Sequence, residues 1–201
     1  SLCVQPKGNP IPQNAPPDQI PEGGKGRQYG NFKKAEGGFG PEIGFARELG
    51  VREKKQLAIV KCAFSGTGMR TDWNPADNGP SGACYRALIK EIKAAIDSAS
   101  KQNIQLNIRA FLWVQGENDS NAKDAPQYEA ALGAMLIQLR KDIGAPHLPA
   151  FLAINTHFGN DKNPFVAQVV EAQKALATKS GLAFYVDSEG AQTLLPSQTH
   201  F

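Results

Sequence analysis

From residue 57 onward, the chain alternates between short apolar runs and longer segments whose apolar residues recur every three or four positions. The first pattern is typical of strands buried on both faces, and the second is typical of helices with one buried side. Strands are therefore predicted at residues 57–64, 104–114, 150–156 and 182–186. Helices are predicted at residues 85–96, 128–139 and 166–177, with a shorter one from Pro41 to Gly50. Such alternation predicts an α/β fold in three layers (α/β/α), with a central parallel sheet between helices.

Residues 1–40 lack this alternation and are rich in Pro, Gly, Asn and Gln, which predicts a long loop. A structureless segment of this length is uncommon inside a compact domain and is usually functional. The loop is therefore expected either to wall a substrate groove or to be a loosely held arm. With 201 residues, 41% of them hydrophobic, the chain suits a single domain with its own core.

Charge and cysteine content narrow the classes of function. The formal net charge is +3, and Lys and Arg are spread along the predicted helices, which argues against a nucleic-acid partner. No apolar stretch approaches the ~20 residues that span a bilayer, and no secretory leader is recognisable, so membrane insertion is not expected. The three cysteines cannot all pair, and their spacing matches no zinc pattern, so no metal is predicted.

Each of the first three predicted strands, in chain order, leads into a short polar segment. These segments are residues 65–68, 115–118 and 155–157. Because the carboxyl ends of parallel strands meet at one edge of a sheet, the three segments are expected around one cleft. A backbone N–H near Gly66 or Gly68, together with the side-chain NH2 of Gln115, could form an oxyanion hole. Segment 65–68 alone also fits an ordinary strand-to-helix turn.

Histidine and glutamate supply the candidate acid and base groups. His200 lies beyond the last predicted strand, where a lone histidine can be either a catalytic base or a solvated side chain. His157 ends a strand at the same edge and is the rival base, whereas His147 lies between prolines and is expected to be structural. Glu117 follows an apolar run, so partial burial is expected instead of an ordinary surface ion pair.

Four segments in the same order resemble the sequence blocks of one enzyme family. They are FGPEIGFAREL at 39–49, the strand, Gly-Thr turn and Trp of 61–73, WVQGEND at 113–119, and THF at 199–201. They are similar to the carbohydrate esterase branch of the SGNH hydrolases, which includes acetylxylan esterases and sialate O-acetylesterases. Tyr128, Arg140 and Gln173 also occur where the helices of this family carry them. Ser65 replaces a glycine of the second block.

The resemblance implies a flavodoxin-like SGNH fold and a serine acetylesterase that needs no metal or organic cofactor. Ser1 aligns with the family's nucleophile, so the strand before it is expected to be missing from the chain. His200 aligns with the general base. The implied oxyanion hole consists of backbone N–H groups at Ser1 and Gly66 and the Gln115 side chain. The implied substrate contacts are Thr67, Trp73 and Asn118, although Trp113 fits the core equally well.

One departure from the family leaves the mechanism open. Ser197 stands where the family has an aspartate three residues before the histidine. Either a Ser-His dyad suffices, or another acid orients His200. The candidates are Glu117, which is preferred, and Asp187 and Glu189. Loss of the acid costs about four orders of magnitude in the serine protease template.

The substrate implied by the resemblance is an acetylated polysaccharide or sialoglycan, and a secreted or periplasmic location is favoured. Two alternatives remain. The chain could be a noncatalytic carbohydrate-binding protein on an esterase scaffold, or an SGNH esterase for lipid or aryl esters. The sequence does not fix the oligomeric state.

Overall fold

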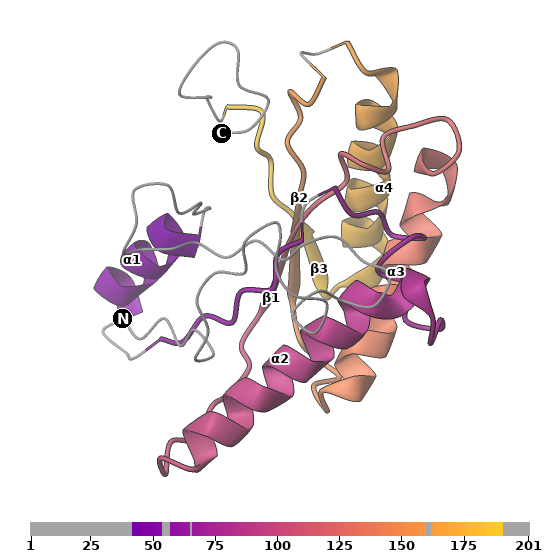
Figure 1. The fold of residues 1–201 in the computed structure, drawn as a ribbon. Helices are drawn as coiled ribbons and strands as arrows, with labels where there is room; N and C mark the ends of the chain where they lie inside the picture. The colour runs from indigo at the N-terminus through magenta and orange to yellow at the C-terminus, as the bar shows by residue number, and fades with distance from the viewer. Residues whose placement is uncertain (1–41, 54–56, 65, 160–161, 191–201) are drawn as a thin grey trace, which may run out of the picture. The chain divides into compact units, whose positions relative to one another are not determined.

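The computed structural model (Figure 1) describes residues 42–53, 57–64, 66–159 and 162–190. Contacts within the chain divide it into two compact units. The first unit comprises Ser1–Ser65 and Asp77–Asn107, and the second comprises Gly66–Ala76 and Ile108–Phe201. The second unit contains the three-stranded sheet and the segments at the carboxyl ends of its strands.

The sheet of the second unit is parallel, with its strands in the order β1-β2-β3. The strands are β1 (Phe111–Val114), β2 (Ala150–Ala153) and β3 (Ala183–Tyr185). Trp113 is paired with Leu152, and Leu152 with Tyr185. Because successive side chains of a strand point to opposite faces, these three side chains share one face of the sheet.

Two helices connect the parallel strands and cover this face. A short 3-10 helix η3 (Ala125–Gln127) leads into α3 (Tyr128–Asp142), and α4 (Pro164–Ser180) follows β2. Helix α4 contacts β2 and β3, and α3 packs against α4 (Figure 1). The buried side of α3 follows the apolar spacing of the sequence and includes Leu132, Met135, Leu136 and Leu139, with Tyr128 at its start.

The ends of α4 carry strong local signals. The side chain of Asn163 accepts a hydrogen bond from the Phe165 N–H at 3.0 Å, which caps the first turn. Pro164 occupies the start of the helix, where its missing N–H costs nothing. Gly181 ends the helix in a left-handed conformation with φ 60°.

The two faces of the sheet differ in exposure. Trp113 and Leu152 are buried on the helix-covered face. On the opposite face, Leu112, Phe151 and Phe184 are 44%, 37% and 46% exposed, and the rings of Phe151 and Phe184 stack at 5.3 Å. The sheet is therefore apolar on both sides, as expected for parallel strands.

A charged side chain fastens α3 to the amino ends of two strands. Arg140 donates hydrogen bonds from Nε to the Leu148 carbonyl at 3.0 Å and from Nη2 to the Leu182 carbonyl at 2.9 Å. Leu148 precedes β2 and Leu182 precedes β3. One guanidinium, with donors in a fixed fork, therefore holds these two entry points at a set distance.

The first unit is helical in its described part. It contains α1 (Glu42–Glu53), the 3-10 helix η2 (Pro80–Gly82) and α2 (Ala83–Ser100). The apolar spacing of α2 agrees with its buried residues, which include Cys84, Tyr85, Leu88, Ala95 and Ala99. Asp77 accepts hydrogen bonds from the Gly79 and Ser81 N–H groups, both at 2.9 Å, and so orders the entry into η2.

The α/β class with a parallel sheet is confirmed, and α2, α3 and α4 occur where helices were predicted. Two strand predictions are corrected. Residues 57–64 contain only isolated bridge residues at Ala58 and Phe64, and residues 104–110 are irregular before β1. An apolar run predicts burial, but a strand also needs a hydrogen-bonded neighbour along its length.

The predicted end of the first helix at Gly50 is also wrong, because α1 continues to Glu53. Glycine ends a helix when it adopts a left-handed conformation. Gly50 is absent from the glycines with positive φ, so it continues the helix. The predicted loop of residues 1–40 lies outside the described residues, and the single-domain organisation stays a prediction.

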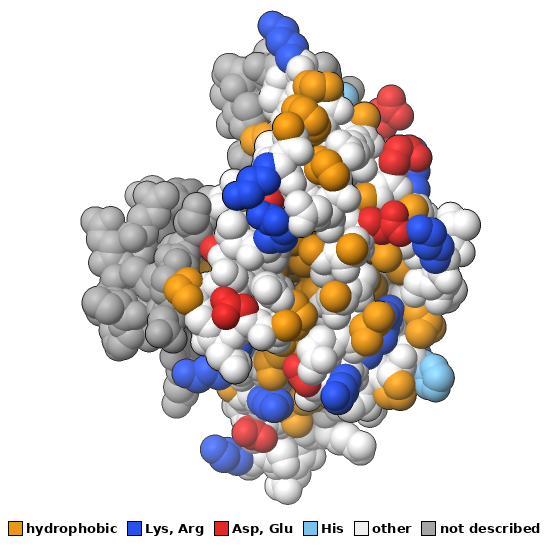
Figure 2. Space-filling model, turned by 90° about the vertical axis from the view of Figure 1, so that its right-hand side faces the viewer, with side chains coloured by type: hydrophobic (Ala, Val, Ile, Leu, Met, Phe, Trp, Pro, Cys, Tyr) orange, Lys and Arg blue, Asp and Glu red, His pale blue; other side chains and the backbone are white. Residues whose placement is uncertain are grey.

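None of the helices in the described ranges has the length and hydropathy that crossing a membrane would require. On the molecular face in Figure 2, basic side chains are interspersed with acidic and hydrophobic ones.

Gly116 lies directly beyond β1 in a conformation that favours glycine, with φ 150°. A Cβ atom at this position would lie 2.6 Å from Ile154 Cδ1 and 2.7 Å from Val169 Cγ1. The close approach brings the end of β1 against the residue after β2 and against α4.

We expect Gly116→Ala to lower the free energy of unfolding by ~2–5 kcal/mol, because backbone strain and overpacking add together. The matched control is Gly181→Ala, which also has a positive φ but open space around its Cβ position. It should cost only ~1–2 kcal/mol. Urea unfolding of the two variants measures the difference, and equal losses would contradict the packing argument.

Candidate active site

The polar segments predicted from the sequence meet at the carboxyl edge of the sheet in the second unit. Gln115 follows β1, and its side-chain NH2 donates to the Thr67 carbonyl at 2.8 Å. Beyond β2 and β3, the Ser188 hydroxyl donates to the Ile154 carbonyl, and His157 Nε2 lies 2.9 Å from the Glu189 carbonyl. Segments that are far apart in the sequence are thus joined at one edge.

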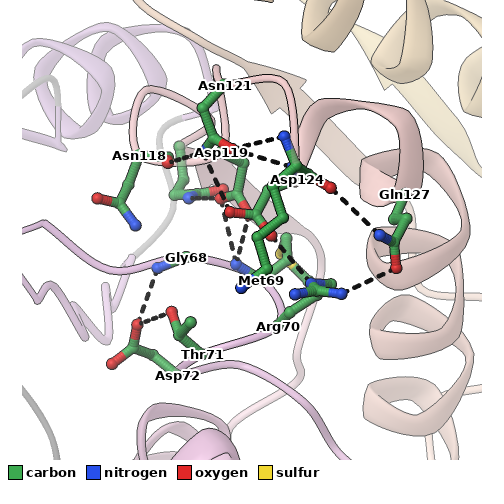
Figure 3. A network of polar contacts seen from close by, with 12 residues as sticks. Gly68, Met69, Arg70, Thr71, Asp72, Asn118, Asp119, Asn121, Asp124 and Gln127 are labelled. Atoms are coloured by element: carbon green, nitrogen blue, oxygen red, sulfur yellow. Dashed lines mark hydrogen bonds and ion pairs between the residues drawn. The ribbon is translucent and has the colours of Figure 1, made fainter.

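A buried carboxylate, Asp119, organises this edge (Figure 3). Its side chain is 2% exposed. Its two carboxylate oxygens accept a hydrogen bond from the Met69 N–H, at 3.0 and 3.1 Å. One of them also accepts from the side-chain NH2 of Gln115 at 2.6 Å. Asp119 therefore binds the turn at Met69 to the segment after β1, across 50 positions of sequence.

Burial raises the pKa of Asp119 from 3.8 to about 6. The hydrogen bonds from Gln115 and Met69 favour the charged form and lower the pKa, but they do not offset the loss of solvation. The nearby carboxylates of Asp124 and Asp72 raise it further. Asp119 thus changes charge near pH 6, within a network that uses both of its oxygens.

A second aspartate shapes the turn itself. Asp72 accepts the Gly68 N–H at 2.9 Å and the Thr71 hydroxyl at 2.6 Å, and its own N–H donates to the Gly68 carbonyl at 3.0 Å (Figure 3). A Cβ atom on Gly68 would lie 2.9 Å from Asn118 Nδ2 and 3.0 Å from Thr71 Oγ1. Only a residue without a side chain fits this position unless its neighbours shift.

An ion pair extends the network toward α3. Arg70 Nε donates to Asp124 Oδ1 at 2.9 Å, and its Nη1 donates to the Gln127 side chain at 3.0 Å (Figure 3). Asn121 Nδ2 donates to the other oxygen of Asp124 at 3.1 Å. The turn at 66–73 is thus held on one side by Asp119 and on the other by Asp124.

Gln115, predicted as an oxyanion donor, uses both hydrogens of its side-chain NH2 within the protein. One goes to the Thr67 carbonyl and the other to Asp119. Its side-chain oxygen lies 3.1 Å from the Tyr128 hydroxyl. A Gln115 hydrogen would reach an oxyanion only if one of these two bonds opened.

Behind Gln115 lies a buried group of polar side chains. The Tyr128 hydroxyl accepts from Trp113 Nε1 at 3.1 Å and from Gln173 Nε2 at 3.2 Å. Burial raises the pKa of Tyr128, so this hydroxyl keeps its proton. Gln173 is fully buried and also donates to the Gln115 carbonyl at 3.1 Å. Sequence reasoning placed Tyr128 and Gln173 in the family pattern but assigned them no role.

Two predicted substrate contacts lie in the interior. Trp73 Nε1 donates to Thr67 Oγ1 at 2.9 Å, and the Trp73 ring meets Trp113 edge to face at 4.9 Å. Trp73, Thr67 and Trp113 are 3%, 4% and 5% exposed. The role of Thr67 and Trp73 in binding substrate stays a prediction, and Trp113 belongs to the core.

The remaining predicted residues of this edge are more accessible. Asn118 is exposed beside Gly68, and Glu117 is half-buried. Glu117 Oε1 accepts the Asn155 N–H at 3.2 Å, which places this carboxylate between the ends of β1 and β2. Of the other acids considered, Asp187 accepts the Glu189 N–H at 2.9 Å. Gly66 opens the turn with φ 61°.

The predicted nucleophile Ser1 and base His200 lie outside the described residues, as do Ser65 and Ser197. Within the described part of the chain, no three His, Cys, Asp or Glu side chains are grouped in a way that could hold a metal ion. The residue that sequence reasoning missed is Asp119. Its signal was its spacing of four residues from Gln115 within the segment 113–119.

The raised pKa of Asp119 predicts a specific pH dependence of stability. A carboxyl whose pKa is higher in the folded protein favours folding when protonated, so this contribution is complete below pH 3.8 and is lost as the pH rises through about 6. We expect the stability of the wild type relative to Asp119→Asn to fall by up to ~3 kcal/mol over this range. Urea unfolding from pH 3.5 to 7 measures it.

The control for this prediction is Asp97→Asn, an exposed position on α2. Its stability difference from the wild type should stay nearly constant over the same range. A difference between wild type and Asp119→Asn that stays flat or grows with pH would contradict the assignment.

Comparisons with known proteins agree with this architecture. Residues 26–201 match the family described as carbohydrate esterase, sialic acid-specific acetylesterase. A crystal structure of a protein from Arabidopsis thaliana is similar, with a TM-score of 0.65 and 27% identity, over 85% of this chain and 64% of that one. This chain thus spans less than two thirds of that protein. No protein of curated function matches the present chain. Because the family match covers most of the sequence, the chain belongs to this family of carbohydrate esterases.

Proposed function

We propose that the chain hydrolyses acetyl esters on the hydroxyl groups of a carbohydrate, either a polysaccharide or a sialoglycan. The observation that carries the proposal is the family match over residues 26–201. The geometry supports it, because Asp119 and Gln115 order a glycine-containing turn at the carboxyl edge of a parallel sheet. This edge is where α/β proteins bind their ligands.

The proposed reaction has two steps. Ser1 Oγ attacks the acetyl carbonyl while His200 accepts its proton, and His200 then protonates the departing sugar oxygen. Water, deprotonated by His200, attacks the resulting acyl-serine, and acetate leaves as His200 returns the proton to Ser1 Oγ. Each step passes through a tetrahedral oxyanion, which requires hydrogen-bond donors that are in place before the reaction.

The oxyanion donors in this proposal are the backbone N–H groups of Ser1 and Gly66. Gly66 opens the turn that Asp119 and Asp72 hold. Fixed donors of this kind lower the barrier because they do not have to reorient when charge develops.

The acid that orients His200 is proposed to be Glu117. Its half-buried carboxylate lies at the ends of β1 and β2 and is already fixed by the Asn155 N–H. The alternatives are Asp187 and Glu189, which are exposed beyond β3. Asn118, exposed beside the turn, is the polar side chain best placed to meet a sugar hydroxyl.

Ser197 in place of the family aspartate favours a second candidate function, namely carbohydrate binding without catalysis. A third is hydrolysis of lipid or aryl esters. Release of acetate from an acetylated xylan or sialoglycan supports the proposal. Binding of the glycan without release favours the second function, and a preference for long acyl chains favours the third.

The nucleophile can be identified directly. We expect the full chain to hydrolyse 4-nitrophenyl acetate and to lose this activity when treated with a serine-directed organophosphonate, because the reagent consumes the activated hydroxyl. Intact mass should show one adduct, and peptide mapping should place it on Ser1. An adduct on Ser65 would overturn the assignment of the nucleophile, and absence of both turnover and adduct would contradict an esterase.

The general base is tested by His200→Ala, which should reduce turnover by at least ~100-fold because general-base catalysis is lost. The circular dichroism spectrum should stay unchanged. His147→Ala is the matched control, since His147 is exposed in the turn before β2 and should be dispensable. Loss of activity in His157→Ala, with activity retained in His200→Ala, would transfer the role to His157.

A further inference from the structure

We propose that Tyr128 and Gln173 are positioning residues of the esterase site, which act by fixing Gln115: Tyr128 contacts its side-chain oxygen and Gln173 its backbone carbonyl. The proposal rests on the proposed function, because it gives the carboxyl edge of the sheet a catalytic role. Tyr128 lies at the start of α3 and Gln173 in the middle of α4, so both reach the edge from the helix layer. Both side chains are almost fully buried, with exposures of 1% and 0%.

Gln173 fixes the spacing between the ends of two strands. Its NH2 donates to the Gln115 carbonyl at 3.1 Å and lies 3.3 Å from the carbonyl of Ala153, the last residue of β2. The same nitrogen lies 3.2 Å from the Tyr128 hydroxyl. One buried amide therefore contacts β1 and β2 at the points where both strands open into the site.

Tyr128 fixes the orientation of the Gln115 side chain. Its hydroxyl already accepts hydrogen bonds from Trp113 and Gln173, so its own proton is the group that it offers to Gln115. The Gln115 carbonyl at 2.9 Å and its side-chain oxygen at 3.1 Å both lie within reach. The two Gln115 oxygens share this one proton, and the side-chain oxygen lies on the side of the helices.

The NH2 end of the Gln115 side chain is fixed by the two hydrogen-bond acceptors that it faces. With its oxygen toward Tyr128, Gln115 points its NH2 at the Thr67 carbonyl and at Asp119, which are both acceptors when Asp119 is ionised. The reverse orientation would bring oxygen against oxygen at these two contacts. Tyr128 and Asp119 therefore define one orientation of Gln115 from opposite sides, and this orientation holds the turn at 67–69.

The unpaired oxygen of Gln173 indicates that this residue serves to position the strand ends rather than to stabilise the fold. Gln173 Oε1 is buried without a hydrogen-bond partner among the described residues. Burying an unpaired amide oxygen is unfavourable, and an apolar side chain of similar size would avoid that cost. The amide nonetheless contacts the two carbonyls that open into the site.

The test uses Tyr128→Phe and Gln173→Leu in the full chain, with 4-nitrophenyl acetate as substrate. Each variant removes the polar contact and keeps a side chain of similar size. We expect kcat to fall by about tenfold or more, because small displacements of reacting groups are costly, while KM stays within about twofold. When Gln115 is already replaced by Ala, adding Tyr128→Phe should change kcat little further, because Tyr128 acts through the Gln115 side chain that is then missing.

Leu139→Val is the matched control. Leu139 is buried on α3, three turns beyond Tyr128, and its side chain has no polar atom. It should lower stability without changing kcat. An unchanged kcat in Tyr128→Phe and Gln173→Leu, or an equal fall in Leu139→Val, would overturn the positioning role.

A second readout does not depend on activity. Hydrogen exchange of the Met69 amide, which donates to Asp119, should be faster in both variants than in the wild type and unchanged in Leu139→Val. Unchanged exchange in the two variants overturns the positioning role. Absence of acetate hydrolysis in the wild type instead contradicts the proposed function, and exchange then still decides whether the two residues hold the turn.

Discussion

The described structure of the second unit depends on the two hydrogen bonds that the Gln115 side chain donates. The bond to the Thr67 carbonyl joins the turn at 67–69 to the segment after β1, at a sequence separation of 48. The bond to Asp119 lies within that segment. The turn buries the side chain of Met69, which is 1% exposed, and its backbone is held by hydrogen bonds to Gln115 and Asp119. Asp119 strengthens the junction from one side, and Tyr128 fixes it from the other. Sheet, helices and turn thus meet at one amide.

The sequence predicted the elements whose burial follows a local period. The spacing of Leu132, Met135 and Leu139 was enough to place α3, and the compact apolar run at 150–156 contained β2. It failed at 57–64, where only Phe64 is buried and no continuous strand forms. The spacing of apolar residues indicates which side of a segment is buried, whereas the hydrogen bonding of a strand depends on residues elsewhere in the chain.

The same distinction applies to the site. The sequence predicted that segments 65–68 and 115–118 would lie together because strand ends share an edge. Gln115 does contact Thr67, although residues 57–64 do not form the strand on which that argument relied. The sequence did not predict that Asp119 would bind Met69, or that Gln173 would reach the carbonyls of two strands. Those contacts arise between segments that only the folded sheet brings together. The roles of Ser1 and His200 were inferred from family resemblance and remain predictions.

The hydrogen bonds that Arg140 and Gln173 make to the sheet differ chemically from those that Asp119 makes to the turn. Arg140 holds the entrances to β2 and β3, and Gln173 holds the exits from β1 and β2. A guanidinium and an amide keep their protonation states at all pH values a cell encounters, whereas Asp119 does not. Protonation of Asp119 near pH 6 therefore changes the charge beside the Met69 turn, whereas the bonds that Arg140 and Gln173 make to the strand ends involve no group that titrates in this range. The polar contacts of the turn and those of the sheet thus differ in their sensitivity to acid.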